Sequence, residues 1–408
     1  MDGGLERVYE TAWAWSRARG HAGHDPFDAL NSRLFQATFL RRSRLARLAW
    51  TQAFKRSPVN LRRLALVPEG RNPKGTALLA LAALSRLRAE GLEADEREAR
   101  ALLDDLLGAR HKAGGAGGAG AAWGYNFDWQ GRAFYAPRGT PAVVPTAFAV
   151  RALTEAAEHF RHASVDYLEA ARGACEFILR GLGRSVETER EVCFSYTPLD
   201  RTRVFNASLL AAEALASVGA LTGERELLDY AARAARYVVR RQRGDGSWAY
   251  GEEGFQSWAD NFHTAFVLTS LARVRRRLAA EDAPTVDEGA AVLHAEIGRA
   301  IRGGFEFWRE RFFLADGWPK YFPDGKFPAD AHSAGACVVA CAELVGEEPR
   351  ALELAERVAG WAVRELFDAR GFFRYQRRRF YTVRTPYLRW SQAWMLYALA
   401  RLLEVKGF

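Results

Sequence analysis

Six strongly apolar segments recur along the chain at intervals of roughly 60 residues, and each one follows a loop. Apolar residues occupy nearly every position in these segments, which predicts helices buried on all sides. Such a period is typical of repeat architectures, in which each unit buries its apolar surface against its neighbours. The predicted buried helices span residues 76–87, 144–160, 204–218, 261–274, 332–345 and 390–403.

Amphipathic segments lie between the buried ones. In the clearest example Leu228, Ala231 and Val238 form one apolar stripe at helical spacing, and arginines occupy the opposite side. A helix of this kind packs one face on a core and leaves the other in water. Five predicted amphipathic helices span residues 94–111, 165–182, 225–241, 287–312 and 350–367, and a sixth is expected within residues 1–56.

Buried and amphipathic helices therefore alternate six times, which predicts an all-α fold. The expected arrangement is an (α/α)6 toroid of six helical hairpins, with the buried helices in an inner ring and the others outside. A ring also explains how residues 1–408 can form a single domain. Residues 112–122 are rich in Gly and Ala and are predicted to be a flexible loop; they are not a phosphate loop, because no strand precedes them.

Composition narrows the class of protein. Half of the residues are apolar (49%), as in a globular chain. The net charge of +9 could attract an anionic partner, but codon bias and a solvated surface are the preferred explanation. No basic cluster is interleaved with aromatic residues, so a nucleic-acid partner is not expected. No cofactor is predicted either.

The cellular context is predicted from what the sequence lacks. No run of about 18 apolar residues is present, so no membrane span is expected. The first residues do not have the basic-then-apolar order of a signal peptide. Four cysteines are too few for a disulfide scaffold, and Cys337 and Cys341 fit core packing. These features favour the cytoplasm.

The distinctive polar and aromatic residues lie in the loops just before the buried helices. In a ring these six loops meet at one mouth. Aromatic faces cover the C–H side of a sugar, amides and carboxylates bind its hydroxyls, and arginine pairs with a uronate. Each aromatic residue alone is more often explained by packing, so the prediction depends on their clustering before the helix starts. The predicted substrate-binding residues are Trp129, Gln130, Arg132, Tyr196, Asn206, Trp248, Tyr250, Trp258, Asn261, Trp318, His332, Arg389 and Trp390.

Two Asp–His pairs are the first candidates for catalysis. Asp260 with His263, and Asp330 with His332, open neighbouring buried helices, and Asp128 is a further acid. The alternative is that both aspartates are N-caps that bind free backbone N–H groups. Capping does not explain why a histidine follows each aspartate within one turn. Zinc could bind such a set, but helical spacing alone is a weak signal and no metal is predicted.

Short segments spread over nearly the whole chain carry a family resemblance. They are DPFDALNS (25–32), KRSPVNLR (55–62), NPKG (72–75), WGYNFDWQ (123–130), QRGDGSWAYG with DNFHTAFVL (242–268) and PYLRWSQAW (386–394). They resemble bacterial proteins encoded beside exopolysaccharide and capsule genes, which are similar to the six-hairpin glycosidase superfamily. The resemblance implies a toroid and a role in polysaccharide biosynthesis or modification. It does not specify the reaction.

A glycoside hydrolase-like enzyme is the first functional prediction, and an oligosaccharide or polysaccharide is the expected partner. Two carboxylates would flank the bond in a bacterial glycan, acidic or neutral. The candidates are Asp128, Asp260 and Asp330. These acids, together with His263 and Arg389, are expected to open into one cavity at one end of the ring.

Two other functions stay open. A uronate lyase or epimerase would neutralise the uronate with Arg389 or Asn261 and move the α-proton with His263 or Tyr250. The third function is a non-catalytic toroid that binds a glycan or an isoprenoid. The DGSW turn at 245–248 resembles the repeat motif of terpene cyclases and prenyltransferases, but the acidic DxDD cyclase motif is absent.

Overall fold

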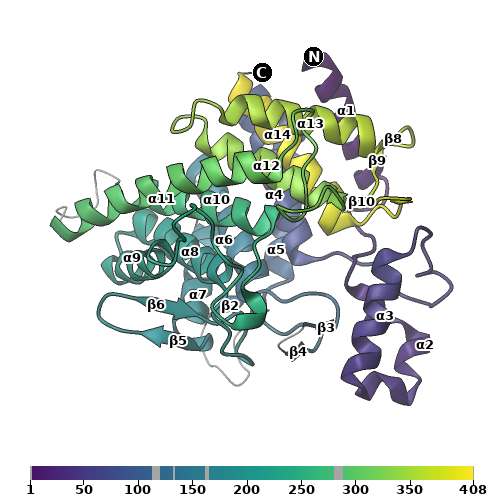
Figure 1. Cartoon of the computed structure of the whole chain (residues 1–408), viewed down its shortest axis with the longest axis horizontal. Helices are drawn as coiled ribbons and strands as arrows, with labels where there is room; N and C mark the ends of the chain where they lie inside the picture. The colour runs from purple at the N-terminus through teal and green to yellow at the C-terminus, as the bar shows by residue number, and fades with distance from the viewer. Residues whose placement is uncertain (1, 113–119, 132–133, 161–164, 280–287, 408) are drawn as a thin grey trace.

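Six buried helices form a closed ring in the computed structural model, which describes residues 2–112, 120–131, 134–160, 165–279 and 288–407 (Figure 1). Each inner helix packs beside the next, and the last one closes the ring against the first. The inner helices are α4 (Pro73–Glu90), α6 (Val143–His159), α8 (Phe205–Thr222), α10 (Asn261–Leu278), α12 (Ala331–Leu344) and α14 (Ala393–Lys406).

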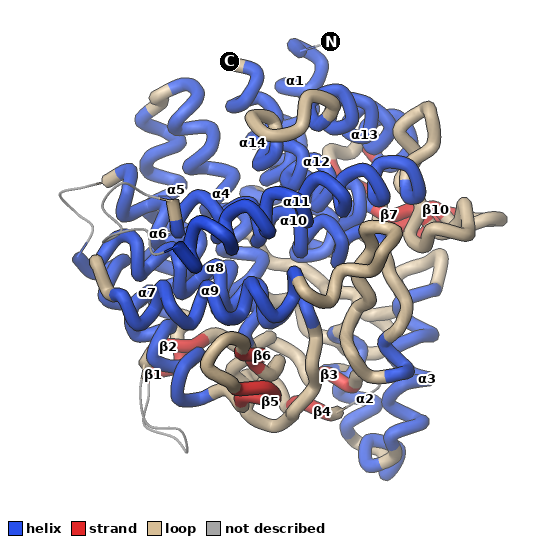
Figure 2. The backbone as a smooth tube through the Cα atoms, turned by 60° about the vertical axis from the view of Figure 1, so that its left-hand side comes forward, coloured by secondary structure: helices blue, strands red, loops and turns tan. Residues whose placement is uncertain are grey.

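A second layer of helices surrounds the ring, and Figure 2 shows α11 lying over α10. The sixth outer helix, α1, packs against α14 from the opposite end of the chain. The (α/α)6 toroid is therefore confirmed, and the first 56 residues do supply an outer helix. The outer helices are α1 (Asp2–Arg17), α5 (Glu93–Gly108), α7 (Val165–Glu176), α9 (Arg225–Val239), α11 (Glu288–Phe312) and α13 (Ala351–Leu366).

The inner helices are apolar because they are covered on every side. In α8 each residue from 205 to 219 is buried between its neighbours α6 and α10. By length and composition α8 would also qualify as a membrane span, which the sequence did not lead us to expect. Because α8 is buried between α6 and α10, its apolar side chains belong to the core of the ring.

Local signals set the ends of the inner helices. Asn72 caps α4 by accepting a hydrogen bond from the backbone N–H of Lys74 at 3.1 Å. Gly91 ends the same helix with φ of +68°, a left-handed conformation that favours glycine. The predicted helix 390–403 is wrong at its start, because Leu388–Gln392 form a π-helical turn and α14 begins at Ala393.

Short antiparallel strands pair within the loops. Two of them, β1 and β2, join the ends of the predicted Gly/Ala loop, whose residues 113–119 lie outside the described part of the chain. A three-stranded sheet connects the loop before α12 to the loop before α14. The strands are β1 (His111–Lys112), β2 (Ala121–Ala122), β3 (Trp129–Gln130), β4 (Tyr135–Ala136), β5 (Arg184–Glu187), β6 (Val192–Phe194), β7 (Ala329–Asp330), β8 (Phe367–Asp368), β9 (Phe372–Phe373), β10 (Gln376–Arg377) and β11 (Thr382–Val383).

One segment projects from the ring beside its mouth (Figure 1). Residues 29–68, called the α2–α3 unit below, contain α2 (Arg33–Gln36) and α3 (Arg44–Arg56). Ala29, Phe54 and Ala65 belong to a small core of its own, separate from the main core. The sequence predicts an outer helix in this region but not a projecting unit.

An ion-pair network joins inner helices near the ring axis. Glu213 of α8 accepts two hydrogen bonds from Arg151 of α6, at 2.6 and 2.7 Å. Arg273 of α10 lies 3.1 Å from Glu213 and 2.7 Å from Glu343 of α12. These charges are almost fully buried, so each depends on its partners.

Candidate active site

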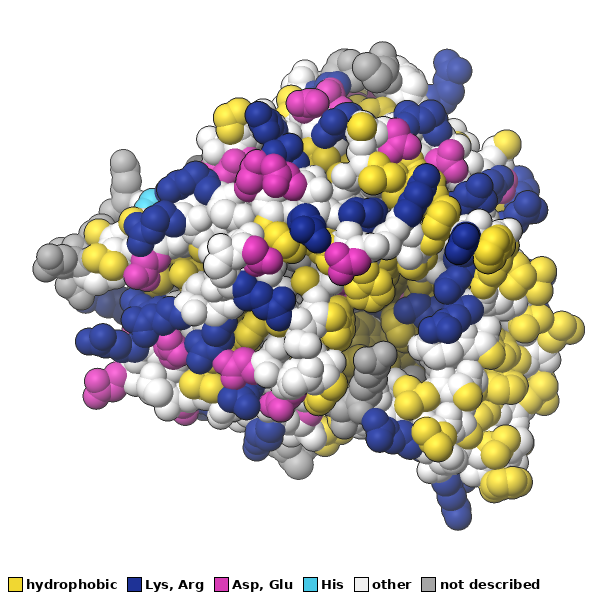
Figure 3. Space-filling model, in the orientation of Figure 1, with side chains coloured by type: hydrophobic (Ala, Val, Ile, Leu, Met, Phe, Trp, Pro, Cys, Tyr) yellow, Lys and Arg dark blue, Asp and Glu magenta, His cyan; other side chains and the backbone are white. Residues whose placement is uncertain are grey.

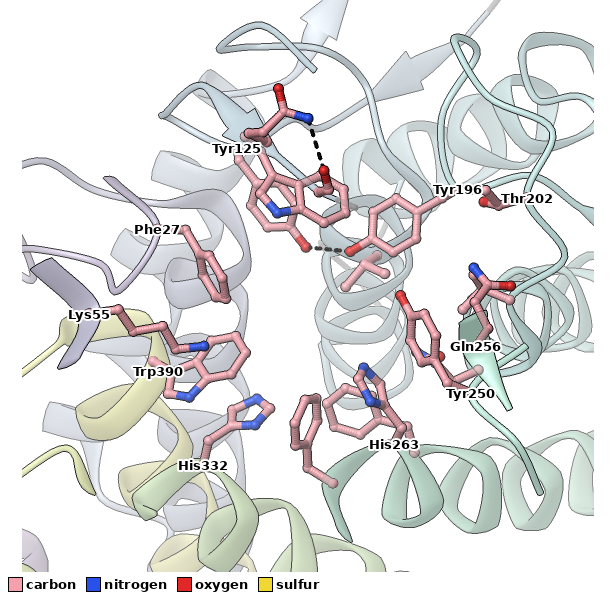
Figure 4. A pocket seen from close by; sticks show the side chains of 18 of the residues that line it. Phe27, Lys55, Tyr125, Tyr196, Thr202, Tyr250, Gln256, His263, His332 and Trp390 are labelled. Carbon is pink, nitrogen blue, oxygen red and sulfur yellow. Dashed lines mark hydrogen bonds between the residues drawn. The ribbon is translucent and has the colours of Figure 1, made fainter. Parts of the chain in front are cut away.

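A cavity of about 890 Å³ opens where the inner helices begin. Figure 3 shows a hollow between the body of the ring and the α2–α3 unit, and Figure 4 shows the side chains from close by. The volume is typical of a small-molecule site. Its aromatic lining consists of Phe27, Tyr125, Phe127, Trp129, Phe134, Tyr196, Tyr250, Phe255, Trp258, Phe262, Phe266, Tyr321, Phe322 and Trp390.

The polar side chains of the cavity are basic or neutral. Among the described residues that line it there is no aspartate and no glutamate. The walls of the cavity would therefore not repel an acidic ligand through a carboxylate. The polar lining consists of Gln52, Lys55, Arg56, Lys74, Gln130, Thr202, Asn206, Gln256, His263, His332 and Arg389.

His263 is held by the residue that starts its helix. The Oδ1 atom of Asp260 accepts a hydrogen bond from the backbone N–H of His263 at 2.9 Å, which is an N-cap. The Oδ2 atom of Asp260 lies 2.9 Å from Nδ1 of His263. An ionised carboxylate only accepts, so Nδ1 carries the proton and Nε2 remains available. Asp260 thus caps the helix and also orients the imidazole.

His332 is buried at the base of the cavity. Its ring stacks on Trp390, with ring centres 4.0 Å apart and planes 15° apart. Among the described residues neither ring nitrogen has a hydrogen-bond partner. Burial lowers the pKa of His332 well below its usual value, and the positive charges of Lys74 and Arg389 lower it further. The imidazole is therefore neutral at pH 7 and keeps a free lone pair.

The two histidines face the same space. Both rings pack against Phe266, whose ring centre lies 6.2 Å from that of His263 and 5.8 Å from that of His332. In Figure 4 their side chains approach the cavity from neighbouring helices. A small substrate in the cavity would meet an imidazole from two directions.

Two lysines reach the cavity from different parts of the chain. The Nζ atom of Lys74, in the first turn of α4, lies 4.3 Å from the ring centre of Phe148. Burial lowers the pKa of Lys74 well below its usual value, with a further contribution from Arg389. The Nζ atom of Lys55 lies 4.3 Å from the ring centre of Phe27, and burial lowers the pKa of Lys55 to about 8. Within the described residues neither lysine pairs with a carboxylate.

Arg389 has a different electrostatic role. Its Nε and Nη2 atoms donate to the two carboxylate oxygens of Asp25, at 2.6 and 2.8 Å, and both side chains are buried. Asp25 is therefore the direct counter-charge of Arg389 within the protein. Lys55, Arg56 and Lys74 are therefore the cavity's cations that have no carboxylate within ion-pairing distance among the described residues. The charges of Asp330 and Asp25 still act on Lys55 and oppose the effect of burial on its pKa.

Most of the predicted binding residues do meet at one mouth. They come from loops that are far apart in the sequence, and the aromatic members contact one another as well as the cavity. Tyr250 stacks on Trp258 with ring centres 4.6 Å apart, and the hydroxyls of Tyr125 and Tyr196 lie 3.0 Å apart. The predicted residues that line the cavity are Trp129, Gln130, Tyr196, Asn206, Tyr250, Trp258, His263, His332, Arg389 and Trp390.

The three candidate acids do not line this cavity, so the expectation that they open into it is wrong. Asp260 binds the start of α10 and His263, as described above. Asp330 caps α12 by accepting from the backbone N–H of Ser333 at 2.8 Å, and burial raises the pKa of its carboxyl. Asp128 accepts from the backbone N–H of Arg138 at 2.8 Å. The carboxylate oxygens of these three acids accept backbone N–H groups and so stabilise the loops and helix starts around the site.

Three further candidates have structural roles instead of lining the cavity. The indole N–H groups of Trp248 and Trp318 donate to backbone carbonyls at 3.0 and 2.8 Å. The amide of Asn261 donates to a backbone carbonyl at 2.9 Å. Arg132 lies outside the described residues. In the described part of the chain no three His, Cys, Asp or Glu side chains gather as metal ligands.

Lys55, Phe262 and Phe266 were not among the predicted site residues, and Lys74 was given no role. Lys55 reaches the cavity only because the α2–α3 unit lies beside the mouth, and local sequence does not show that contact. Residues 261–274 are apolar at nearly every position, so the sequence alone indicates that the two phenylalanines belong to the core. Only Lys74 could have been recognised from the sequence, because a lysine in the first turn of an otherwise buried helix is unusual and indicates a functional site.

Comparisons with known proteins agree on the fold. No family model and no curated protein matches the sequence. Cellobiose 2-epimerase from Bacillus thermoamylovorans is similar in structure, with 14% identity, a TM-score of 0.57, and 83% of this chain and 87% of that chain covered. An unsaturated glucuronyl hydrolase specific for heparin has 12% identity, a TM-score of 0.58, and coverage of 84% and 89%.

A family 76 α-mannanase from Bacteroides thetaiotaomicron has 14% identity and a TM-score of 0.54, and the match covers 82% of this chain and 86% of that chain. At such low identity these likenesses establish the six-hairpin architecture alone. They agree with the part of the resemblance that concerns the toroid. The proximity to exopolysaccharide genes remains a prediction.

Proposed function

We propose that the protein is a carbohydrate-active enzyme that moves a proton on an acidic sugar residue, as an epimerase or a lyase does. One observation carries the proposal: the cavity combines aromatic faces, two imidazoles and unpaired lysines, and its described lining has no carboxylate. The structural neighbours named as a sugar epimerase and a glucuronyl hydrolase support a sugar as the ligand.

The hydrolase prediction fits this cavity less well. Glycoside hydrolysis generally needs two carboxyl groups about 5–10 Å apart on either side of the bond. The described lining offers none, because Asp260 and Asp330 act as caps. The lyase or epimerase alternative needs only the imidazoles and cations that are present.

The proposed chemistry starts at the carbon beside the uronate carboxylate. Lys55 pairs with that carboxylate and makes the adjacent C–H more acidic. The neutral ring of His332 takes the proton, while His263, which Asp260 holds through Nδ1, donates one from Nε2. Protonation of the carbon on its other face gives an epimer. Departure of the group at the β-carbon, with the donated proton on its oxygen, gives an unsaturated sugar.

A panel of acidic and neutral bacterial glycans, read by mass spectrometry, tests this proposal. Hydrolysis splits a glycan and adds the mass of one water. Elimination splits it without adding water, and epimerisation changes retention without changing mass. The proposal predicts one of the last two outcomes, on a glycan that contains uronate. Products that all carry an added water would contradict it.

Asp260→Asn is expected to keep the parent's melting temperature and to lower turnover at least tenfold. Asparagine caps a helix as well as aspartate does, but a neutral amide holds the Nδ1–H group of His263 less strongly than a carboxylate does. Thermal unfolding and turnover on the glycan found in the panel check this. Asp245→Asn is the control, because Asp245 also accepts a backbone N–H, that of Ser247 at 2.9 Å, but is exposed and does not line the cavity. It should retain both properties. Parent-like turnover in Asp260→Asn would contradict the orienting role.

The pH dependence of kcat/KM is expected to follow the loss of the proton from the ammonium group of Lys55. The ammonium group is present below its pKa of about 8 and is lost above it, so kcat/KM for an acidic glycan should fall as pH rises through 8. Lys55→Arg keeps the charge and should move this decline to higher pH, whereas Lys55→Met should lower kcat/KM throughout. An unchanged decline in Lys55→Arg would show that another group titrates.

A further inference from the structure

The α2–α3 unit carries the whole net charge of the chain. Residues 29–68 contain eight arginines and one lysine and no acidic residue. The chain has 58 basic and 49 acidic residues, so the remainder has 58 − 9 = 49 basic residues and balances its 49 acids. The positive charge is therefore concentrated on one projecting part of the surface.

Large apolar side chains are exposed on the same unit. Phe39 is 84% exposed, and Leu45 and Leu64 are each 77% exposed. Seven of the fifteen large hydrophobic residues that the described surface exposes belong to these forty residues, so they form a local concentration. Figure 3 shows hydrophobic side chains gathered along the outer side of this unit. A monomeric protein in water rarely leaves such a patch uncovered.

Arginines lie among these apolar side chains. Arg33, Arg41, Arg42 and Arg63 are exposed, and none of them pairs with a carboxylate in the described part of the chain. Elsewhere on the surface arginines commonly pair with glutamates, as Arg277 does with Glu158. The unit thus presents unneutralised guanidinium groups next to exposed phenylalanine and leucine.

We infer that the α2–α3 unit is a docking surface for an anionic lipid bilayer. Apolar side chains enter the boundary between headgroups and acyl chains, and arginines bind the lipid phosphates around them. An anionic bilayer therefore binds both the exposed apolar side chains and the arginines. A nucleic acid would use the arginines but leave the exposed leucines in water.

The position of α3 connects this surface to the cavity. Leu45, near the start of α3, is exposed, while Leu48, Gln52 and Lys55 line the cavity. A unit that rests on a bilayer would hold the cavity mouth beside the membrane surface. Glycans attached to lipids would then be within reach. The inference concerns the unit's surface and does not depend on the reaction in the cavity.

Vesicle flotation with the full chain tests the inference. Vesicles of phosphatidylcholine and phosphatidylglycerol in equal parts should carry the protein, and vesicles of phosphatidylcholine alone should carry much less. Binding should weaken as salt is added, because the lipid surface potential is screened. Absence of binding to the anionic vesicles at low salt would overturn the inference.

Two sets of variants separate charge from apolar contact. Arg41→Gln with Arg42→Gln and Arg63→Gln is expected to reduce binding to anionic vesicles by at least about tenfold. Phe39→Ser with Leu45→Ser is expected to reduce it by about tenfold or more. Because all five side chains are exposed, the melting temperatures should stay close to the parent's.

The control pair is Leu92→Ser, at the turn between α4 and α5, with Arg97→Gln in the N-terminal part of α5. Both residues are exposed, and this end of α4 is the one away from the cavity. Binding should not change in this control. If both sets of α2–α3 variants bind like the parent, as the control does, the inference is wrong. Concentration-dependent self-association that the Phe39 and Leu45 changes abolish, without vesicle binding, would assign the surface to a second copy of the chain and would equally overturn it.

Discussion

Replacing His263 with glutamine is expected to lower turnover about 10²–10⁴-fold, the usual contribution of an acid–base group. Glutamine can still bind a hydroxyl but cannot exchange a proton near neutral pH. The side chain is partly exposed at the cavity and caps nothing, so the fold should not change. Steady-state turnover and thermal unfolding of the same preparation measure both expectations.

His159→Gln provides the control for this variant. His159 is an exposed histidine at the end of α6 remote from the cavity, so its loss removes an imidazole without touching the site. Turnover of this control should equal the parent's. If His263→Gln folds normally and also turns over at the parent's rate, the imidazole does not take part in the reaction.

Replacing Glu343 with glutamine is expected to reduce the free energy of unfolding by about 3–5 kcal/mol. Glu343 of α12 is buried and pairs with Arg273 and Arg276 of α10 and with Arg401 of α14. Its neutral replacement would leave three positive charges with too few partners at the ring axis. Urea unfolding measures the change. Glu353→Gln, at an exposed pair with Arg357, should stay within about 0.5 kcal/mol of the parent.

The same network gives stability a defined pH dependence. The pKa of Glu343 is well below its usual value, because the charges of Arg273, Arg401 and Arg276 outweigh the effect of burial, which acts in the opposite direction. A carboxylate with a lowered pKa stabilises the fold above the unfolded value of about 4.5 and loses that contribution as pH falls through the folded value. The melting temperature should therefore drop below about pH 4.5, and less steeply in Glu343→Gln. An equal slope in both proteins would contradict this assignment.

Helical periodicity was sufficient to predict the ring. The buried helices are apolar nearly all round, and only a closed arrangement covers them on all sides, which is why α8 looks like a membrane span by composition alone. Periodicity could not predict the α2–α3 unit. Its helices are short, and its core is built from contacts between residues as distant as Ala29 and Val67.

The site was predictable only in part, for a related reason. Loops before inner helices converge in any such ring, so Tyr250, His263 and Trp390 could be placed correctly at the mouth. The direction of each side chain depends on local hydrogen bonds. Asp330 turns its carboxylate to the backbone of its own helix, and the sequence of the loop does not distinguish a cap from a catalytic acid.

Deuterium exchange at the carbon beside the uronate carboxylate tests the central claim most directly. The parent protein and His263→Gln would each be incubated in D2O with the acidic glycan found in the panel, and the products would be read by NMR. The parent should introduce deuterium at that carbon or remove its proton by elimination, and His263→Gln should do so at least 10²-fold more slowly. Conversion of the glycan by the parent with this proton fully retained would contradict the account.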